Sequence, residues 1–364
     1  MDYEACSSIE AVSPEWKILQ EEGKSSVFQT IEWVSYWTSV VGIEQEIEPL
    51  IVVARSRGKK LPSLIVPFGI RTVFGVRIMS VLGGFHADYS GAVVQGEQNN
   101  HADVLFWEET GKIARAKKID VIWVHNIPSF VEGVANPLWS PECIRSGEAN
   151  SIIWSQPWSE YSQELVHVRI RPDSRRQRKR LSEIGKLRFY IPESDEGKKT
   201  FAEIMIDQKE QRYRAMGIKN QFDRPENREF YIGAIRRENE FKPHVSALML
   251  EDDVLAVHWG EVYKGRFYYL MPSHAEKWAK YSPGRLLLEN LLEWSFSSGY
   301  TNFDFTVGDE AYKYQWANLG IPLFEYKKAL TMKGSAYLAM RDFYRRYIHS
   351  GSKETGRKVK DWKS

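Results

Sequence analysis

The sequence YSPGRLLLENLLEWSFSSGYTNFDFTVGDEAYKYQW, residues 281–316, predicts a turn, a helix and a strand in close succession. Pro283 fixes its own φ and Gly284 permits positive φ, so residues 282–285 are expected to form a turn. Leucines at helical spacing follow this turn, and Gly299 is a typical C-terminal stop for the helix. A helix that begins at such a turn directs unsatisfied N–H groups toward one point. The turn is therefore a candidate anion site.

Residues 302–307 predict a strand in which apolar and polar side chains alternate. Asp304 is the carboxylate inside this otherwise apolar strand, and Gly308 ends it. A short helical segment follows, with four further candidate site residues, Asp309, Tyr312, Lys313 and Trp316. An aspartate beside the turn indicates a site at the end of a sheet. The same pattern also fits a core helix and a core strand that carries a surface aspartate.

The length of 364 residues favours two domains of similar size. We predict an N-terminal domain over 1–160, a C-terminal domain over 161–350 that carries the turn at 282–285, and a basic tail over 351–364. The net charge of +2 is close to neutral. Bulk electrostatics therefore does not indicate a nucleic-acid-binding protein.

Two cysteines, Cys6 and Cys143, are far apart in the sequence and form no Cys-x-x-Cys or Cys/His cluster. The sequence therefore predicts neither a disulfide framework nor a metal site. The acidic N-terminus lacks the order of a signal peptide, and no run approaches the roughly 20 apolar residues that span a bilayer. We expect no transmembrane segment and a cytoplasmic location.

The first half of the chain predicts a pair of helices over 14–41, followed by strands that alternate with helices. We expect strands over 48–54, 61–69, 73–82, 92–94 and 120–124, and a helix over 101–117. The loop GGFHADYSG, residues 83–91, carries Asp88 and Tyr89 among glycines. It is either an ordinary long turn or a binding loop.

The second half resumes the α/β pattern after an irregular, proline-rich stretch over 126–163. We expect helices over 197–215, 226–239 and 333–348, and strands over 187–191, 245–250, 254–263, 266–271 and 323–331. The three strands between 245 and 271 predict an antiparallel meander. The fold class is therefore α/β (α+β).

A basic helix precedes this second half. Five of the six residues after Ser174 are basic, and the group includes Arg175 and Arg176. Most charge runs of this kind are solvated connecting helices. The alternative is a face that binds phosphate or RNA.

The order of meander, glycine turn, helix and strand resembles that of the GNAT acyltransferase fold. Specific phrases resemble the FemAB-like GNAT superfamily, and within it the CelD-type proteins. These phrases are FQTIEW (28–33), GGFHADYSG (83–91), RRQRKRL (175–181), YSPGRLLL (281–288) and FDFTVGDEAYKYQW (303–316). The resemblance implies two GNAT-like domains in tandem, with mixed central sheets flanked by helices. It also implies a link to cellulose and exopolysaccharide biosynthesis in bacteria.

The resemblance implies that the turn holds the pyrophosphate of an acyl-CoA, with Ser282, Pro283, Gly284 and Arg285 as its residues. A typical acetyl-CoA-binding GNAT has a Q/R-x-x-G-x-G/A pattern, whereas this chain has one glycine followed by Arg285. Relatives in the FemAB group use aminoacyl-tRNA as the donor. The basic helix would serve a tRNA, so this donor remains an alternative.

Acyl transfer to an amine or hydroxyl needs a binding site for the acyl donor, a base that takes the acceptor's proton, and a group that stabilises the oxyanion. The candidate bases are Asp304, His258 and Asp88. Lys313 is a candidate partner for developing negative charge, and Tyr312 is a candidate acid. His258 also fits a hydrogen-bonded structural histidine, and Asp304 fits a cap or a partner of Lys313. The candidate substrate contacts are Tyr89, Asp309, Trp316, Arg175 and Arg176.

No Ser/His/Asp triad or nucleophilic cysteine is visible, so we expect direct transfer without a covalent intermediate. The first hypothesis is an acyltransferase that moves an acyl group from acyl-CoA to a cell-envelope or exopolysaccharide-related acceptor. The second is an aminoacyl-tRNA-dependent ligase. The third is a non-catalytic accessory protein of polysaccharide biosynthesis.

Overall fold

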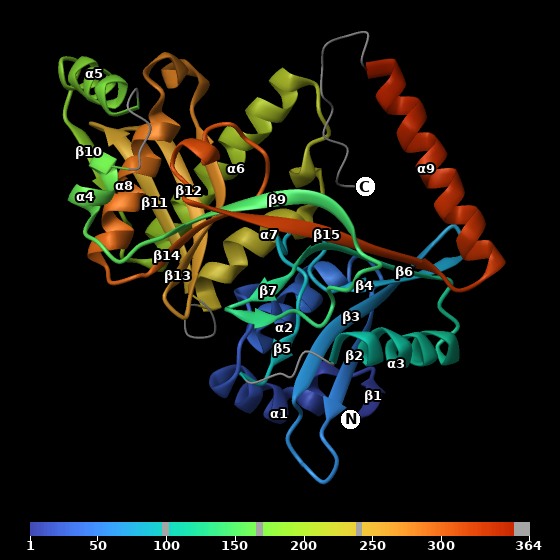
Figure 1. The fold of residues 1–364 in the computed structure, drawn as a ribbon. Helices are drawn as coiled ribbons and strands as arrows, with labels where there is room; N and C mark the ends of the chain where they lie inside the picture. The colour runs from blue at the N-terminus through green and yellow to red at the C-terminus, as the bar shows by residue number, and fades with distance from the viewer. Residues whose placement is uncertain (97–101, 165–169, 238–241, 353–364) are drawn as a thin grey trace. The chain divides into compact units, whose positions relative to one another are not determined.

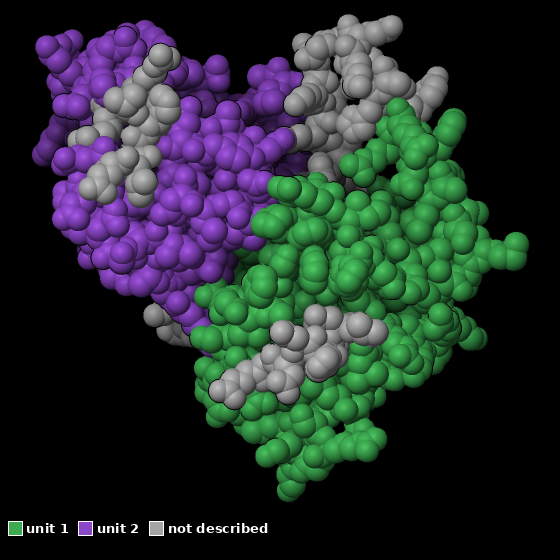
Figure 2. All heavy atoms as spheres, in the orientation of Figure 1, with its two compact units in different colours: residues 1–147, 322–364 green, residues 148–321 purple. Residues whose placement is uncertain are grey.

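A computed structural model describes residues 1–96, 102–164, 170–237 and 242–352 (Figure 1). The chain forms two compact units, which Figure 2 shows in different colours. Unit 1 consists of Met1–Gly147 and Pro322–Ser364, and unit 2 is Glu148–Ile321. The sequence prediction assigned the final strand and helix to the second domain. In the structure they belong to unit 1, because the final strand pairs with a strand of that unit.

Unit 1 is built on a mixed sheet with the strand order β1-β2-β3-β4-β6-β15, and β5 pairs with β3. The strands are β1 (Asp2–Cys6), β2 (Glu48–Arg55), β3 (Leu64–Val73), β4 (Val76–Val81), β5 (Val93–Val94), β6 (Val121–Pro128) and β15 (Leu319–Ala329). Neighbours from β1 to β4 are antiparallel, whereas β4 and β6 are parallel. The interior strands read as continuous apolar runs because both of their faces are buried.

Helices surround the sheet of unit 1. They are α1 (Ile9–Glu22), α2 (Ile31–Trp37), α3 (Ala102–Ala116) and α9 (Met332–Ser352), with short helical turns at Val27–Gln29 and Thr38–Gly42 and a small hairpin of β7 (Phe130–Val131) and β8 (Val134–Ala135). Ser8 and Thr30 cap the N-termini of α1 and α2 by accepting backbone N–H bonds. Leu50, Phe68 and Phe106 are fully buried members of the core.

Unit 2 has the strand order β9-β14-β13-β12-β11-β10. The strands are β9 (Ile144–Ile153), β10 (Leu187–Tyr190), β11 (Lys242–Leu250), β12 (Asp253–Tyr263), β13 (Arg266–His274) and β14 (Asn302–Val307). The helices are α4 (Trp158–Glu164), α5 (Ile170–Ser182), α6 (Asp195–Met216), α7 (Pro225–Gly233) and α8 (Pro283–Ser297), with short helical turns at Gln221–Asp223, Ala234–Arg237, Glu276–Tyr281 and Lys313–Gln315. Strands β10 to β13 form an antiparallel meander, and α8 connects β13 to the parallel strand β14.

Helices α7 and α8 cover opposite faces of the unit 2 sheet. Trp259 of β12 packs against Phe230 and Tyr231 of α7. The neighbouring side chain, His258, projects to the other face, because side chains alternate along a strand. On that face the leucines of α8 pack against Phe267 and Tyr269 of β13 and form the core of the unit.

The predicted fold class is confirmed, since both sheets are mixed and flanked by helices. Four strands are absent from the prediction. Strand β1 was read only as an acidic N-terminus, and β7, β8 and β9 lie in the stretch that was read as irregular. Strand β13 also continues to His274, beyond the predicted end at residue 271. No helix in the described ranges is both long enough and apolar enough to cross a bilayer.

Candidate functional site

The parallel strands β13 and β14 of unit 2 separate soon after they meet. Residues 266–268 pair with residues 302–304, and the pairing stops there. Strand β13 continues for six residues to His274, while β14 remains paired with β9 on its other side. We call the diverging segments, 269–274 and 305–307, the β13–β14 fork (Figure 1). Helix α8 begins beyond the far end of β13.

Asp304 lies at the closed end of the fork and is fully buried. Its Oδ2 accepts a 2.7 Å bond from Arg266 Nη1 of β13, and its Oδ1 accepts a 2.8 Å bond from the Thr306 N–H. Thr306 has a φ of 55°, at the point where the register between β14 and β9 shifts. Asp304 therefore holds the strands together where they begin to part. A buried carboxylate that is already paired is poorly placed to accept a proton, and its partner is Arg266 instead of Lys313.

Lys313 is also buried and ties the following loop back to β14. Its Nζ donates to the carbonyl oxygens of Phe305 and Val307 at 2.8 and 2.9 Å and pairs with Glu310 at 3.2 Å. Gly308 has a φ of 140°, and a Cβ at this position would lie 2.1 Å from Glu310 Oε2. A glycine is therefore needed for the loop to fold back. The geometry gives Lys313 a positioning role.

Tyr312 lies at the fork beside charged and aromatic groups from three elements. Burial raises the pKa of its hydroxyl, the charge of Glu310 raises it further, and the charge of Arg212 in α6 opposes the rise. Burial raises the pKa of Tyr269 on β13 as well, and Tyr312 and Glu310 add to that shift. The ring of Tyr312 lies edge-on to that of Phe305 of β14, with centroids 6.4 Å apart. Because its pKa is raised, Tyr312 stays protonated at neutral pH.

The turn that opens α8 differs in detail from the prediction. The residue with positive φ is Ser282, at 54°, whereas Gly284 is already helical because the helix begins at Pro283. A Cβ at Gly284 would meet only His274 Nδ1, at 3.8 Å, so the space beside this backbone is open. The side chain of Arg285 is engaged elsewhere, because its Nη2 pairs with Asp173 of α5. The open N-terminus of α8 is therefore a stronger candidate for an anion than the Arg285 side chain.

His274 ends β13 and lies next to Gly284. Burial lowers the pKa of its imidazole, and the charge of Arg212 lowers it further. The imidazole is therefore neutral at pH 7. The sequence prediction assigned residue 274 to a loop and did not identify it as a site residue. No pattern in the sequence brings His274, Arg212 and Glu310 together, since they come from separate elements.

His258 is fully buried beneath α8. Its ring stacks on Tyr269 with centroids 4.4 Å apart and lies 6.3 Å from the ring of His244. Burial lowers the pKa of His258 well below 6.5, with a smaller contribution from His244. An enclosed, neutral side chain cannot reach a substrate. His258 is therefore a core residue, but it is not the hydrogen-bonded histidine that the sequence suggested, because among the described residues neither ring nitrogen has a hydrogen-bond partner.

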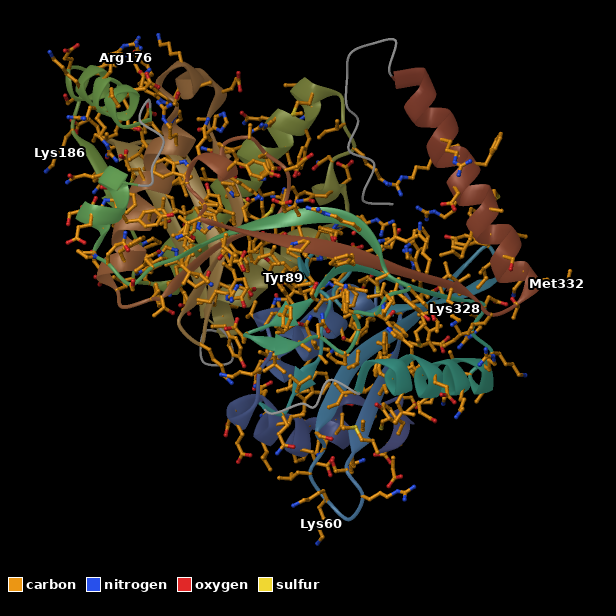
Figure 3. All side chains as sticks on the ribbon, in the orientation of Figure 1. Lys60, Tyr89, Arg176, Lys186, Lys328 and Met332 are labelled. Atoms are coloured by element: carbon orange, nitrogen blue, oxygen red, sulfur yellow. The ribbon has the colours of Figure 1, made fainter. Side chains whose placement is uncertain are left out.

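The basic helix α5 packs beside the start of α8. Arg178 Nη2 donates to Glu289 Oε2 at 3.1 Å and to Asn290 Oδ1 at 3.0 Å. The Arg180 guanidinium lies 4.8 Å from the centroid of the Tyr281 ring. Arg175 and Arg176 remain exposed, and Arg176 pairs with Asp173 of its own helix (Figure 3). Some residues of the charge run therefore attach α5 to the start of α8, and others form an exposed basic face next to the turn.

The remaining predicted residues are distributed over the two units. Trp316 is buried in unit 2, where its carbonyl accepts a 2.6 Å bond from the Tyr161 hydroxyl, and Asp309 is exposed. Asp88 and Tyr89 belong to unit 1. The Tyr89 side chain is buried, and its carbonyl accepts a 2.8 Å bond from Gln29. In the described parts of the chain, no group of three or more His, Cys, Asp or Glu is arranged to hold a metal ion.

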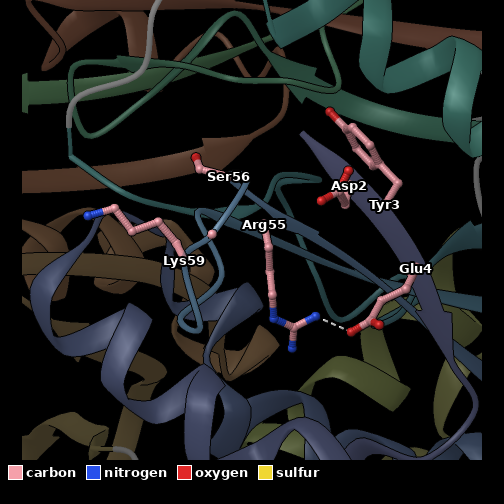
Figure 4. A pocket seen from close by; sticks show the side chains of 7 residues that line it. Asp2, Tyr3, Glu4, Arg55, Ser56 and Lys59 are labelled. Atoms are coloured by element: carbon pink, nitrogen blue, oxygen red, sulfur yellow. Dashed lines mark hydrogen bonds and ion pairs between the residues drawn. The ribbon is translucent and has the colours of Figure 1, made fainter.

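A surface pocket of about 200 Å³ lies in unit 1, between β1 and the turn that joins β2 to β3 (Figure 4). It is lined by Asp2, Tyr3, Glu4, Arg55, Ser56, Gly58 and Lys59. Arg55 is already paired with Glu4 and Glu15. Because these two carboxylates neutralise the charge of Arg55, this pocket has no evident ligand.

Residues 169–314 match the family model of the acetyltransferase (GNAT) domain. The matched segment lies within unit 2 and includes the β13–β14 fork and the α8 turn. Unit 2 has the GNAT fold. The match supports acyltransferase activity for this GNAT-fold unit. No curated protein matches the chain.

Solved structures resemble the chain over nearly its whole length. The crystal structure of FemX has a TM-score of 0.60 at 13% identity and covers 90% of this chain and 97% of its own. A C-terminal domain of a putative lysylphosphatidylglycerol synthetase from Agrobacterium fabrum has a TM-score of 0.56 at 12% identity, covering 92% and 95%. L-PGS from Bacillus licheniformis has a TM-score of 0.52 at 13% identity, covering 92% and 96%. At these identities the likeness concerns the fold alone.

Proposed function

We propose that the protein transfers an acyl group from an acyl-CoA to an amine or hydroxyl. The observation that carries this proposal is the β13–β14 fork, with the open N-terminus of α8 beyond its far end. The family match over residues 169–314 supports the same class of reaction.

The fork suits the extended arm of coenzyme A. An unpaired strand edge presents N–H and C=O groups, which can bond to the amides of that arm as a neighbouring strand would. The six residues of β13 beyond the last pair span roughly 20 Å, at about 3.3 Å per residue. In this proposal the arm runs along β13, with the thioester beside Phe305 and Tyr312 and the phosphates at Gly284. The phosphates would be stabilised by the start of α8 and by the nearby charge of Arg212.

Groups on the loop that follows β14 can supply the proton transfers. The acceptor nitrogen or oxygen attacks the thioester carbonyl, and the carbon–sulfur bond breaks as the new bond forms. The CoA thiolate then takes a proton from Tyr312, which is protonated at neutral pH. We assign Glu310 as the group that takes the proton released by the acceptor and returns it to Tyr312, because its carboxylate is partly exposed on the same loop. Glu310 is thus our candidate base in unit 2, in place of Asp304 and His258.

We propose that the acceptor belongs to cell-envelope or exopolysaccharide metabolism. This part rests on the resemblance of the sequence to CelD-type proteins. The α/β fold accommodates many acceptors, so the resemblance is the support for this choice.

A second candidate function is transfer of an aminoacyl group from a charged tRNA. The exposed Arg175 and Arg176 favour it, because they lie on α5 beside the α8 turn. Charge reversal of both residues should then abolish binding of a tRNA, and binding should weaken steeply with salt.

The proposed reaction is tested by following a labelled acetyl group from acetyl-CoA into an envelope extract. Wild-type protein should transfer the label, and Tyr312→Phe should slow transfer by about 100-fold because the proton donor is lost. Tyr314→Phe is the matched control, since Tyr314 is half exposed in the same segment and should behave as wild type. Transfer from charged tRNA but not from acetyl-CoA would replace the first candidate by the second.

A further inference from the structure

One face of the unit 1 sheet carries an arginine for which the described residues provide no acidic partner. Arg71 lies on β3, directly opposite Ile78 of β4, in the interior of the sheet. The residue is half-buried, and its Nε is buried without a hydrogen-bond partner among the described residues. Burial lowers the pKa of this guanidinium, although an arginine stays charged at any ordinary pH. Charged side chains that leave water are normally paired, so Arg71 needs an explanation beyond the packing of the sheet.

A second arginine reaches the same place from α9. Ile78 and Tyr337 of α9 belong to one small apolar cluster. Arg71 is the cross-strand partner of Ile78 and shares its face of the sheet, so it lies beside that tyrosine. Arg341 donates from Nη1 to the Tyr337 hydroxyl at 3.3 Å, and its guanidinium lies 4.8 Å from the centroid of the Trp123 ring. Two guanidinium groups therefore flank one hydroxyl.

The acids on this face of the sheet are paired with other groups. Glu325 of β15 pairs with Lys327 at 3.0 Å and accepts a bond from β6, and Asp342 of α9 lies 3.7 Å from the same lysine. One turn beyond Arg341, Arg345 is exposed and adds a positive charge on the same side of α9. Within the described ranges, the fold thus gathers positive charge around the tyrosine without supplying an acid for it.

We propose that Arg71, Tyr337 and Arg341 bind the phosphoryl group of a small phosphorylated molecule. A guanidinium presents parallel N–H donors that match two oxygens of a phosphate, and such bidentate bonds are strong because they are charge-assisted. A phosphate monoester carries roughly two negative charges at neutral pH, which match the two arginines, whereas a carboxylate carries one. The Tyr337 hydroxyl accepts from Arg341, so its own proton remains to be donated to a phosphate oxygen.

This site belongs to unit 1, whereas the proposed acyl-CoA site belongs to unit 2. The test is equilibrium dialysis of the full-length protein against labelled inorganic phosphate, and then against labelled glycerol phosphate, at constant ionic strength. Wild type should bind both compounds. Gly284→Asp should bind them as well, because it alters only the α8 turn. Arg71→Met and Arg341→Met should each weaken binding by about tenfold or more, since each removes hydrogen bonds to a charged group.

Thermal stability gives a second readout. Arg71→Met keeps the length of the side chain and removes a charge that is unpaired in the free protein. In chloride it should therefore melt at the same temperature as wild type or at a higher one. Addition of phosphate should raise the melting temperature of wild type more than that of Arg71→Met.

Arg77→Gln is the matched control for both measurements. Arg77 lies on β4 next to Ile78, so its side chain projects to the opposite face of the same sheet. Its two terminal nitrogens already donate to Glu48, each at 3.1 Å. The variant loses the same charge as Arg71→Met, and phosphate binding should be unchanged.

Several outcomes would overturn the proposal. Binding of neither compound by wild type would remove the site. Equal binding by wild type, Arg71→Met and Arg341→Met would place the phosphate elsewhere, and binding that is lost only in Gly284→Asp would assign it to the α8 turn. An equal loss in Arg77→Gln would show that net charge decides the binding. A marked fall in the melting temperature of Arg71→Met in chloride would make Arg71 a structural residue.

Discussion

At the scale of single residues, the structure separates side chains that build the fork from those that can act in it. Asp304 and Lys313 are buried and bonded to neighbouring strands or carbonyls. Tyr312 packs edge-on against Phe305 of the fork, and Glu310 pairs with Lys313 on the same loop. A polar residue in an apolar strand is therefore not enough to identify a base, since pairing across strands explains Asp304 equally well.

Asp304→Asn should destabilise the protein by about 1.5–3 kcal/mol, because it weakens the charge-assisted hydrogen bond between a fully buried carboxylate and the partly buried Arg266. The amide oxygen still accepts the Thr306 N–H, so the loss isolates the ion pair. Urea unfolding of the variant gives the value. Asp304→Asn/Arg266→Met should recover part of the loss, since both charges are then gone. An Asp304→Asn protein of wild-type stability that has lost its activity would instead support the role of Asp304 as a base.

The sequence pointed to the same region as the proposed site, but to only part of the residues that the structure brings together there. Gly284 and Tyr312 could be found because the turn, helix, strand and loop are consecutive in the chain. Arg212, His274 and Glu310 could not be found in this way. Arg212 comes from α6, and its place near His274 depends on how α6 packs on the sheet.

At the scale of elements, local patterns predicted most of the helices and strands. The strand 302–307 and the meander are clear because apolar residues alternate or run together between turns. Strand β9 was missed because its sequence, IRSGEANSII, is polar and half exposed over its first part. Such a strand is stabilised by pairing with β14, and its own side chains carry no strand signal.

Strand β15 contributes an acid-sensitive contact to unit 1. Burial alone would raise the pKa of Glu325, but hydrogen bonds from His125, from Trp123 of β6 and from Lys327 lower it from 4.5 to about 2. A carboxylate whose pKa is lower in the folded than in the unfolded protein stabilises the fold at pH values above its unfolded-state pKa. This stability is lost as the pH falls through the folded-state pKa. The Glu325 contribution should therefore disappear between about pH 4.5 and pH 2.

Glu325→Gln should flatten the dependence of unfolding free energy on pH over that range. Urea unfolding at several pH values measures the slope. Glu142→Gln is the matched control, since Glu142 is exposed and pairs with Lys328 of the same strand. A slope that is equal in wild type and Glu325→Gln would contradict the account of this contact.

At the scale of the whole molecule, the fold class could be predicted and the division of the chain could not. Two α/β units follow from length and from the alternation of strands and helices. The last strand and helix return to unit 1, because β15 pairs with β6 far back in the sequence. That pairing depends on the three-dimensional packing of residues 121–128 and 323–329. Neither segment carries a local pattern that predicts it.

The most direct test of the central claim is the melting temperature of the full-length protein during titration with acetyl-CoA. A ligand that binds only the folded state raises this temperature as its concentration passes the dissociation constant. We expect a rise for wild type and for Gly284→Ala, and none for Gly284→Asp. The space at Gly284 is open and an aspartate favours a helix N-terminus, so Gly284→Asp should itself remain fully stable. An equal rise in the melting temperature of Gly284→Asp would show that the phosphates do not bind at the α8 turn. No rise in wild type with acetyl-CoA or longer acyl-CoAs would contradict the acyl-CoA donor altogether.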